Sequence, residues 1–135
     1  EDRTNNYFMT PDTLQENLFD SVGKAIVEIS KQINAQAIVV FTFEGRTARI
    51  ISKYKPESKI IAISNSFATM NNLCLRWGVT SVYREKIDKE HLAIDDAKEL
   101  LLSSGLAQKG DLIIFTAGAP YSEKSRANWL RFEVM

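Results

Sequence analysis

The chain has 135 residues, with 17 basic and 17 acidic side chains, 44% hydrophobic residues and a single cysteine. This length suits one domain, and no stretch approaches the about eighteen consecutive apolar residues of a membrane span. We therefore expect no membrane association, and the lack of a secretory signal pattern favours a cytoplasmic protein. One cysteine, Cys74, and one histidine, His91, are too few for a structural metal site, and zero net charge argues against nucleic-acid binding.

Helical and strand patterns alternate along the chain. A first-turn proline at Pro11 and apolar residues at helical spacing as far as Ile33 predict a long amphipathic helix. A nearly continuous apolar, β-branched run follows it, which is typical of a strand buried on both faces. The same reasoning predicts strands at residues 37–43, 59–64, 80–84, 111–116 and 128–134, and further helices at 47–54, 67–77 and 88–105.

This order of elements predicts the fold class. Strands that alternate with crossover helices form an α/β sandwich with a mostly parallel sheet. The connection between residues 116 and 128 has no helix signal, so we expect the last strand to return antiparallel to its neighbour, as an edge strand with one solvated face. Ligand-binding loops then belong at the carboxyl ends of the parallel strands, after Phe43, Ser64, Arg84 and Thr116.

Positive charge is concentrated in the middle of the chain. Residues 1–45 carry 3 bases and 7 acids (net −4), residues 46–90 carry 9 and 4 (net +5), and residues 91–135 carry 5 and 6 (net −1). Arg46, Arg49 and Lys53 recur at helical spacing and share one face. Two interpretations stay open at this point, an ordinary solvated helix face or a surface that attracts an anion.

Most short enzyme signatures are missing from the sequence. It has no G-x-G-x-x-G, no nucleophile elbow, and no acidic pair of the kind that a phosphate-accepting receiver domain needs. His91 lies in the first turn of a predicted helix, where we expect a structurally neutral histidine. Cys74 shares helical spacing with Phe67, Met70 and Trp77, which indicates a small buried hydrophobic residue and not a reactive thiol.

One segment has the features of a phosphate site. Thr42 to Thr47 leads from a buried strand into a helix N-terminus, where free backbone N–H groups and the helix dipole favour an anion. The threonine hydroxyls can donate hydrogen bonds, and Arg46 supplies a charged fork. The alternative is an ordinary strand-to-helix turn, in which Gly45 only allows the tight bend.

Several ordered motifs resemble one protein family. The run AIVVFTFEGRTARIISKYKPESKIIAIS, residues 37–64, resembles the C-terminal domain of pyruvate kinase. NLCLRWGV at 72–79 and KGDLIIFTAGAP at 109–120 are similar to later segments of the same domain. On this resemblance, residues 10–135 form a domain like the C-terminal domain of pyruvate kinase, and residues 1–9 are a linker from a preceding domain.

The resemblance implies a fold and a function. The fold is a three-layer α/β/α sandwich with a mixed five-stranded sheet, whose last strand is antiparallel. The family's domain helps to build a tetramer and binds a phosphorylated allosteric effector, a sugar phosphate or AMP. Phosphoenolpyruvate, ADP, Mg²⁺ and K⁺ bind in a barrel domain that would lie upstream of Glu1, so we expect no catalytic residue, metal or cofactor in this chain, and no turnover by the chain alone.

The resemblance also identifies the residues of an effector site. Thr42, Gly45 and Thr47 match the family's phosphate loop, and Arg46 falls at a variable position within it. Glu44 stands where the family usually has serine, and its carboxylate repels a phosphate and has no proton to donate. The second effector loop has no glycine in this sequence, and its candidate residues are Lys124, Ser125, Arg126 and Asn128.

Three functions remain open from the sequence. The first is the regulatory and assembly domain of a pyruvate kinase, which has the rest of that chain as a partner and forms a homo-oligomer. The second is a free-standing domain that binds a small phosphorylated metabolite. The third is a pure assembly module with a vestigial effector site.

Overall fold

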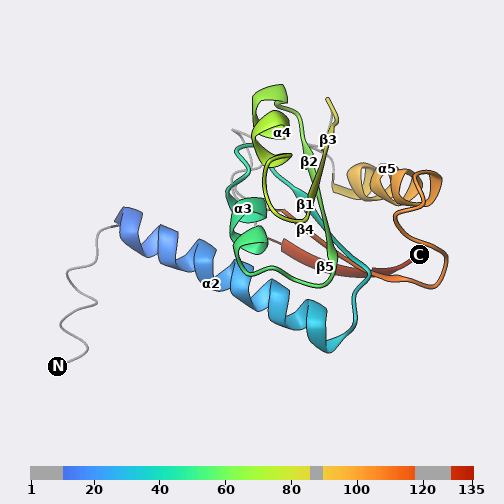
Figure 1. Cartoon of the computed structure of the whole chain (residues 1–135), viewed down its shortest axis with the longest axis horizontal. Helices are drawn as coiled ribbons and strands as arrows, with labels where there is room; N and C mark the ends of the chain where they lie inside the picture. The colour runs from blue at the N-terminus through green and yellow to red at the C-terminus, as the bar shows by residue number, and fades with distance from the viewer. Residues whose placement is uncertain (1–10, 86–89, 118–128) are drawn as a thin grey trace.

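A computed structural model of the chain describes residues 11–85, 90–117 and 129–135. Helices and strands alternate through most of these ranges, as the sequence predicts (Figure 1). In chain order they are α2 (Pro11–Gln32), β1 (Ala37–Phe41), α3 (Arg46–Lys53), β2 (Lys59–Ser64), α4 (Phe67–Leu73), β3 (Val79–Tyr83), α5 (Glu90–Ser103), β4 (Leu112–Ala117) and β5 (Trp129–Val134).

The five strands form one mixed sheet in the order β3-β2-β1-β4-β5. Central β1 pairs in parallel with β2 and β4, β2 pairs in parallel with β3, and β5 runs antiparallel to β4. Phe41, the last residue of β1, lies opposite Ile63 of β2 and Ala117 of β4. The carboxyl ends of the parallel strands therefore meet at one edge of the sheet, and the predicted mostly parallel sheet is confirmed.

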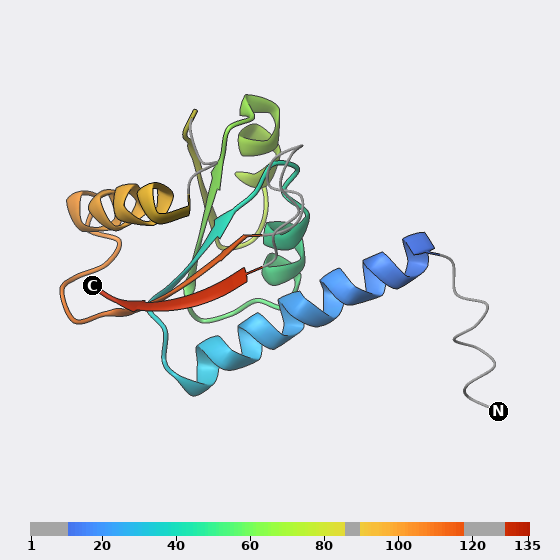
Figure 2. The same cartoon turned by 180° about the vertical axis from the view of Figure 1, so that it is seen from behind.

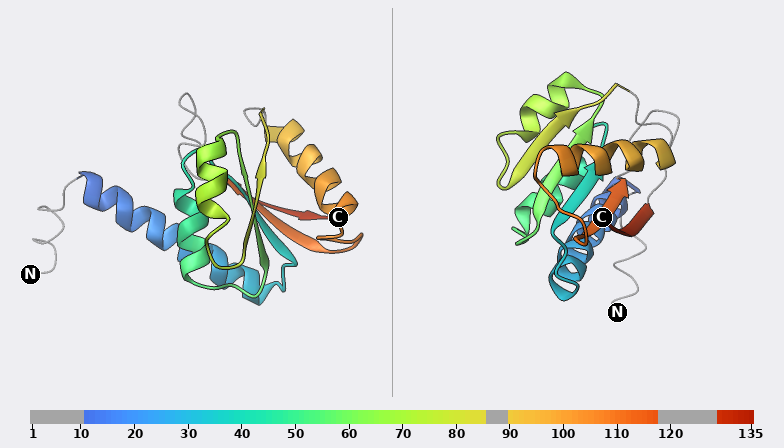
Figure 3. Two further views of the ribbon diagram at one scale, coloured as in Figure 1. Left: turned by 45° about the horizontal axis from the view of Figure 1, so that its top comes forward. Right: turned by 90° about the vertical axis from the view of Figure 1, so that its right-hand side faces the viewer.

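Helices cover the sheet on both faces. Helices α2, α3 and α4 lie on one face and α5 lies on the other (Figures 1 and 3). Because successive side chains of a strand point to opposite faces, Val39 and Phe41 join the core beneath α5, whereas Ile38 and Val40 join the core beneath α2, α3 and α4. The expected three-layer α/β/α architecture is confirmed.

Helix α2 contacts α3 over only part of its length. Gly23 is buried in this contact, and a Cβ atom there would lie 3.2 Å from Cβ of Ile50. The first turns of α2 project beyond the sheet (Figures 1 and 2), and Leu18 is 55% exposed. The same helix thus holds α3 in place and presents apolar side chains at the surface.

Helix α4 is shorter than the sequence predicts. It ends at Leu73, four residues before the predicted end at Trp77, and the chain then turns through Gly78, which has a φ of 68°. The hydroxyl of Ser52 donates a 2.7 Å hydrogen bond to the carbonyl of Trp77, which ties this turn to α3. The prediction that Cys74 is buried was therefore wrong: its side chain is exposed, because it follows the helix and does not lie on its inner face.

The edge strand β5 has an unusual surface. Its antiparallel pairing with β4 confirms the prediction for the last strand. The side chains exposed on one face are apolar, with Leu130 at 39%, Phe132 at 49% and Val134 at 64%. On the other face, Trp129 contacts Phe41 with 5.9 Å between ring centroids. An edge with exposed apolar side chains is a surface that proteins usually cover.

Candidate functional site

The segment between β1 and α3 forms a closed turn at the carboxyl edge of the sheet. β1 ends at Phe41, two residues before the predicted end, so Thr42 belongs to the turn. Thr42 is only 3% exposed, and its backbone N–H donates to the carbonyl of Ile63 at 2.9 Å. Its hydroxyl oxygen accepts the backbone N–H of Gly45 at 2.7 Å. Thr42 therefore fixes the turn and still has a hydroxyl proton to donate.

Gly45 sets the start of α3. Its φ of 86° lies in the left-handed region, which a residue with a side chain rarely adopts. A Cβ atom at this position would also lie 3.1 to 3.2 Å from carbon atoms of Leu73. In the described part of the chain, no side chain caps this helix at Gly45. Helix α3 thus begins at a left-handed glycine directly after a buried strand, the arrangement in which the N–H groups of a first helical turn favour an anion.

Glu44 and Arg46 form an ion pair beside this helix start. Nη2 of Arg46 lies 3.7 Å from Oε2 of Glu44, with both side chains about half exposed. Nη1 of Arg49 donates a 3.2 Å hydrogen bond to the backbone carbonyl of Glu44. An exposed pair of this kind contributes about 0–1 kcal/mol, so an anion with two or three charged oxygens can compete for the arginine.

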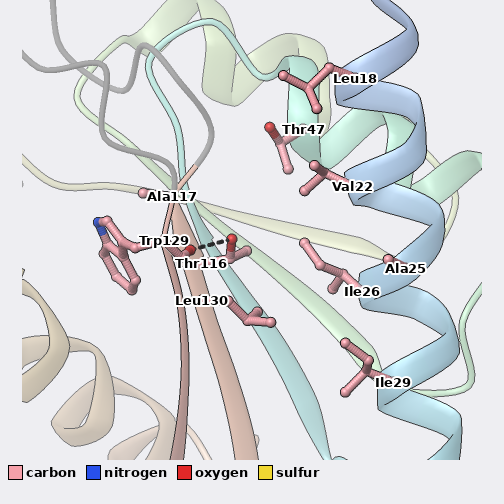
Figure 4. Close-up of a pocket in the computed structure, with 10 residues that line it drawn as sticks. All are labelled: Leu18, Val22, Ala25, Ile26, Ile29, Thr47, Thr116, Ala117, Trp129 and Leu130. Atoms are coloured by element: carbon pink, nitrogen blue, oxygen red, sulfur yellow. Dashed lines mark hydrogen bonds between the residues drawn. The ribbon is translucent and has the colours of Figure 1, made fainter.

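Thr47 lies on the inner side of α3. It is 3% exposed and borders a hollow of about 270 Å³ between α2 and the sheet. Figure 4 shows it beside Leu18 and Val22 of α2, above the apolar part of the hollow. In the same view the hydroxyl of Thr116 donates to the carbonyl of Trp129 at 2.8 Å. Thr47 therefore lies between the turn at Gly45 and the apolar surface of the hollow.

The neighbouring strand end adds polar groups that the sequence predicts only as a helix cap and not as part of a site. The hydroxyl of Thr69 on α4 donates to the carbonyl of Phe43 at 2.7 Å, and Ser66 caps α4 by accepting the N–H of Thr69. The side-chain oxygen of Asn65 is buried and has no hydrogen-bond partner among the residues that the structure describes. Buried polar atoms usually have one, so this oxygen is a second polar feature of the carboxyl edge. The sequence feature that could have indicated Asn65 is its position directly after Ser64, where a ligand-binding loop is expected.

The second predicted effector loop lies outside the described residues. Its candidates are Lys124, Ser125, Arg126 and Asn128, all within 118–128. The site that can be described therefore consists of the turn from Thr42 to Thr47.

An ionic cluster joins α2 to the far end of α3. Oδ1 of Asp20 lies 2.6 Å from Nζ of Lys53, and its other oxygen accepts the hydroxyl of Tyr54 at 2.7 Å. The hydrogen bonds from Lys53 and Tyr54 lower the pKa of Asp20, and the bond to Asp20 raises the pKa values of Lys53 and Tyr54. The helix face that the sequence predicts to be basic is thus partly neutralised here.

Two properties of the described ranges bear on other functions. No group of three or more His, Cys, Asp or Glu side chains is placed to hold a metal ion there. None of the helices in these ranges is long and apolar enough to cross a bilayer.

A family model described as "Pyruvate kinase, alpha/beta domain" matches residues 20–132. The chain belongs to the pyruvate kinase family. The match covers all elements from the middle of α2 to β5, and it identifies the chain as the C-terminal domain of a pyruvate kinase. The resemblance found in the sequence is confirmed.

Individual pyruvate kinases give the same result. The chain is 34% identical over 122 residues to pyruvate kinase of Staphylococcus epidermidis and 30% identical over 121 residues to that of Geobacillus stearothermophilus, in each case over 90% of this chain. A structure described as Cryptosporidium parvum pyruvate kinase in complex with ADP superposes with a TM-score of 0.77 at 28% identity, covering 86% of this chain and 23% of that one. The chain spans about a fifth of the length of the curated relatives, 21% of each.

Proposed function

We propose that this chain is the regulatory and assembly domain of a pyruvate kinase, a cytoplasmic enzyme of glycolysis that transfers a phosphoryl group from phosphoenolpyruvate to ADP. The observation that carries the proposal is the turn through Thr42 and Gly45 into the N-terminus of α3, at the carboxyl edge of the sheet, in a chain of this family. Phosphoryl transfer, with its Mg²⁺ and K⁺, would belong to a catalytic domain outside this chain, so we expect no turnover by the chain alone.

The effector would be a sugar phosphate or AMP, bound through its phosphate. Its oxygens would accept hydrogen bonds from the first N–H groups of α3 and from the guanidinium of Arg46. The hydroxyl of Thr42, whose oxygen already accepts from Gly45, would donate from the floor of the turn. The buried position of Thr42 supports this role, because it makes the turn rigid before the ligand arrives.

Calorimetric titration with a sugar monophosphate, a sugar bisphosphate and AMP tests this site. We expect at least one of them to bind, and Arg46→Ala to weaken that binding about tenfold, as the loss of a charge-assisted hydrogen bond does. Lys31→Ala is the matched control, because Lys31 is exposed in the last turn of α2, away from the carboxyl edge. Equal affinity of the wild type and Arg46→Ala would exclude the site.

Assembly would use the apolar face of β5 and the adjoining part of α2. Leu130, Phe132 and Val134 are exposed on β5, and Leu18 and Val22 are exposed on α2 across the hollow of Figure 4. An edge strand also has backbone N–H and C=O groups that can pair with another strand. A second copy of the domain, or the rest of a pyruvate kinase chain, would cover this surface.

Sedimentation analysis of the chain tests the assembly surface. We expect a concentration-dependent dimer or larger assembly that Phe132→Lys shifts towards the monomer. Leu102→Lys is the control, because Leu102 is similarly exposed (43%) but lies on α5, on the opposite face of the sheet. A wild type that stays monomeric at high concentration, or two variants that behave alike, would contradict the proposal.

One observation favours a pure assembly module as the second candidate. Glu44 holds Arg46 at the place where an effector phosphate would bind. If this pair is the resting arrangement of a vestigial site, none of the three phosphorylated ligands will bind the wild type, and the assembly result above will still hold. The calorimetric titration therefore separates the two candidates.

A further inference from the structure

The hollow between α2 and the sheet combines a buried floor with an exposed rim. Its volume is about 270 Å³, whereas an engineered cavity of about 150 Å³ in another protein already binds benzene. Ile26 and Ala117 are buried at its floor, and Leu18, Val22 and Leu130 are exposed at its rim. The hollow is therefore enclosed by packed side chains on one side and open to solvent on the other, as small-molecule sites usually are.

The hollow has few polar groups. In the described part of the chain, no charged side chain lines it, and its polar side chains are Thr47 and Thr116. The hydroxyl of Thr116 donates to the carbonyl of Trp129, so its oxygen can still accept a hydrogen bond. Thr47 is almost fully buried, and its hydroxyl makes no hydrogen bond with any residue that the structure describes. Because buried hydroxyls usually have a partner, Thr47 offers a hydrogen-bonding group to a molecule in the hollow.

The α2 wall of the hollow is held in place from its other side. Gly23 of α2 packs against Ile50 of α3, and Asp20 bonds Lys53 and Tyr54 at the end of α3. These contacts fix α2 against α3 without any molecule in the hollow. A site that is formed before its ligand arrives loses less free energy to ordering when the ligand binds.

We propose that this hollow binds a small, neutral and mostly apolar molecule, such as an aromatic alcohol of one or two rings, whose hydroxyl bonds Thr47. At the volume per carbon of benzene in its cavity, a two-ring molecule of ten carbons needs about 250 Å³, which is close to the volume of the hollow. A fatty-acid carboxylate fits less well, because no cation lines the described part of the hollow to pair with its charge.

This inference goes beyond the proposed effector and assembly sites and depends on neither. Thr42 and Arg46 of the effector site line no part of the hollow, and neither does Phe132 of the assembly surface. Leu18, Val22 and Leu130 belong to both the hollow and the assembly surface. The variant Phe132→Lys, which is expected to favour the monomer, therefore shows whether the site is complete within one chain.

Calorimetric titration of the 135-residue chain with 2-naphthol tests the hollow. Ala25→Phe should weaken binding at least tenfold, because Ala25 lines the hollow at an exposed position of α2 and a phenyl ring there would occupy it. Ser21→Phe is the matched control and should stay within twofold of the wild type, because it adds the same ring at an exposed position of α2 that does not line the hollow. Circular dichroism checks that both variants keep the helix content of the wild type.

Thr47→Val tests the polar contact, because it replaces the hydroxyl by a methyl group of similar shape. We expect this variant to weaken binding of 2-naphthol about fivefold, as the loss of one hydrogen bond does, and to leave binding of naphthalene within twofold. Equal effects of Thr47→Val on the two ligands would overturn the hydrogen bond to Thr47.

The remaining outcomes decide the proposal itself. No binding of 2-naphthol at millimolar concentration, or equal weakening by Ala25→Phe and Ser21→Phe, would overturn it. Loss of binding in Phe132→Lys would also overturn it, because the ligand would then lie between two copies of the chain. Octanoate that binds more tightly than 2-naphthol at pH 7 would contradict the neutral class of ligand.

Discussion

At its N-terminal end, α3 begins at a left-handed glycine next to an arginine that pairs with Glu44, whereas the basic side chains of its outer face line an open groove together with Lys55 and Arg76. The first surface depends on the turn through Thr42 and Gly45, and the second depends on side chains and on the turn after α4. The difference shows that the fold divides one run of positive charge in the sequence between two surfaces, one defined by backbone geometry and the other by basic side chains.

Both surfaces require α3 to stay in its place against α2. Gly23→Ala puts a methyl group against the Cβ and Cγ2 atoms of Ile50. We therefore expect it to lower the free energy of unfolding by about 1–3 kcal/mol. Chemical denaturation measures this, with Glu28→Ala, at an exposed position of the same helix, as the control. A loss no larger than that of the control would mean that α2 does not hold α3.

The turn at Gly45 should be the next most sensitive position. Gly45→Ala forces a side chain into the left-handed region and against Leu73, at an expected cost of about 1–2 kcal/mol. Gly110→Ala is the matched control, because Gly110 has a similar φ of 92° but no atom within 4 Å of its Cβ position. A loss at Gly45 that exceeds the loss at Gly110 measures the contact with Leu73, and equal losses would show that this contact is relieved.

Removal of the competing carboxylate should make the two surfaces more alike. Glu44→Ser releases Arg46 and adds a hydroxyl donor, so it should strengthen phosphate binding at the helix start by about 1–2 kcal/mol. Calorimetry with the phosphorylated ligands named above measures the change, and Glu57→Ser removes an equally exposed carboxylate for comparison. Unchanged affinity in Glu44→Ser would mean that the turn does not face the ligand.

The smallest expected effect concerns the ionic cluster at the far end of α3. The pKa of Asp20 is lower in the folded chain than its usual value of 3.8, so its contribution to stability is present above about pH 4 and is lost as the pH falls through the folded pKa. Denaturation of the wild type and Asp20→Asn should therefore show a stability difference that is larger at pH 7 than at pH 2. A difference that is the same at both pH values would contradict this role of Asp20.

Much of the fold could be predicted from the sequence. The apolar, β-branched runs predict buried parallel strands because a strand covered on both faces needs no alternation of polar residues, and β1 and β2 are buried along almost their whole length. The end of α4 could not be predicted. The turn that follows it is tied to α3 by a long-range hydrogen bond from Ser52 to the carbonyl of Trp77, which no local pattern shows, and Cys74 lies in this turn and is exposed.

The candidate site could be predicted in part. The helix N-terminus after a buried strand and the glycine at its start follow from residue type and order, and both are present in the structure. The ion pair between Glu44 and Arg46 and the position of Trp77 opposite α3 depend on side-chain placement in three dimensions. Sequence reasoning therefore found the turn and the basic face, but not the groove that the basic face helps to form.

Backbone amide chemical shifts during titration with a sugar phosphate test the central claim most directly, because they report on each end of α3 separately. The proposed effector site predicts that the largest shifts occur at the N–H groups of Arg46, Thr47 and Ala48, in the first turn of the helix. Largest shifts at Lys55, Arg76 and Trp77, or no shifts along α3, would contradict it.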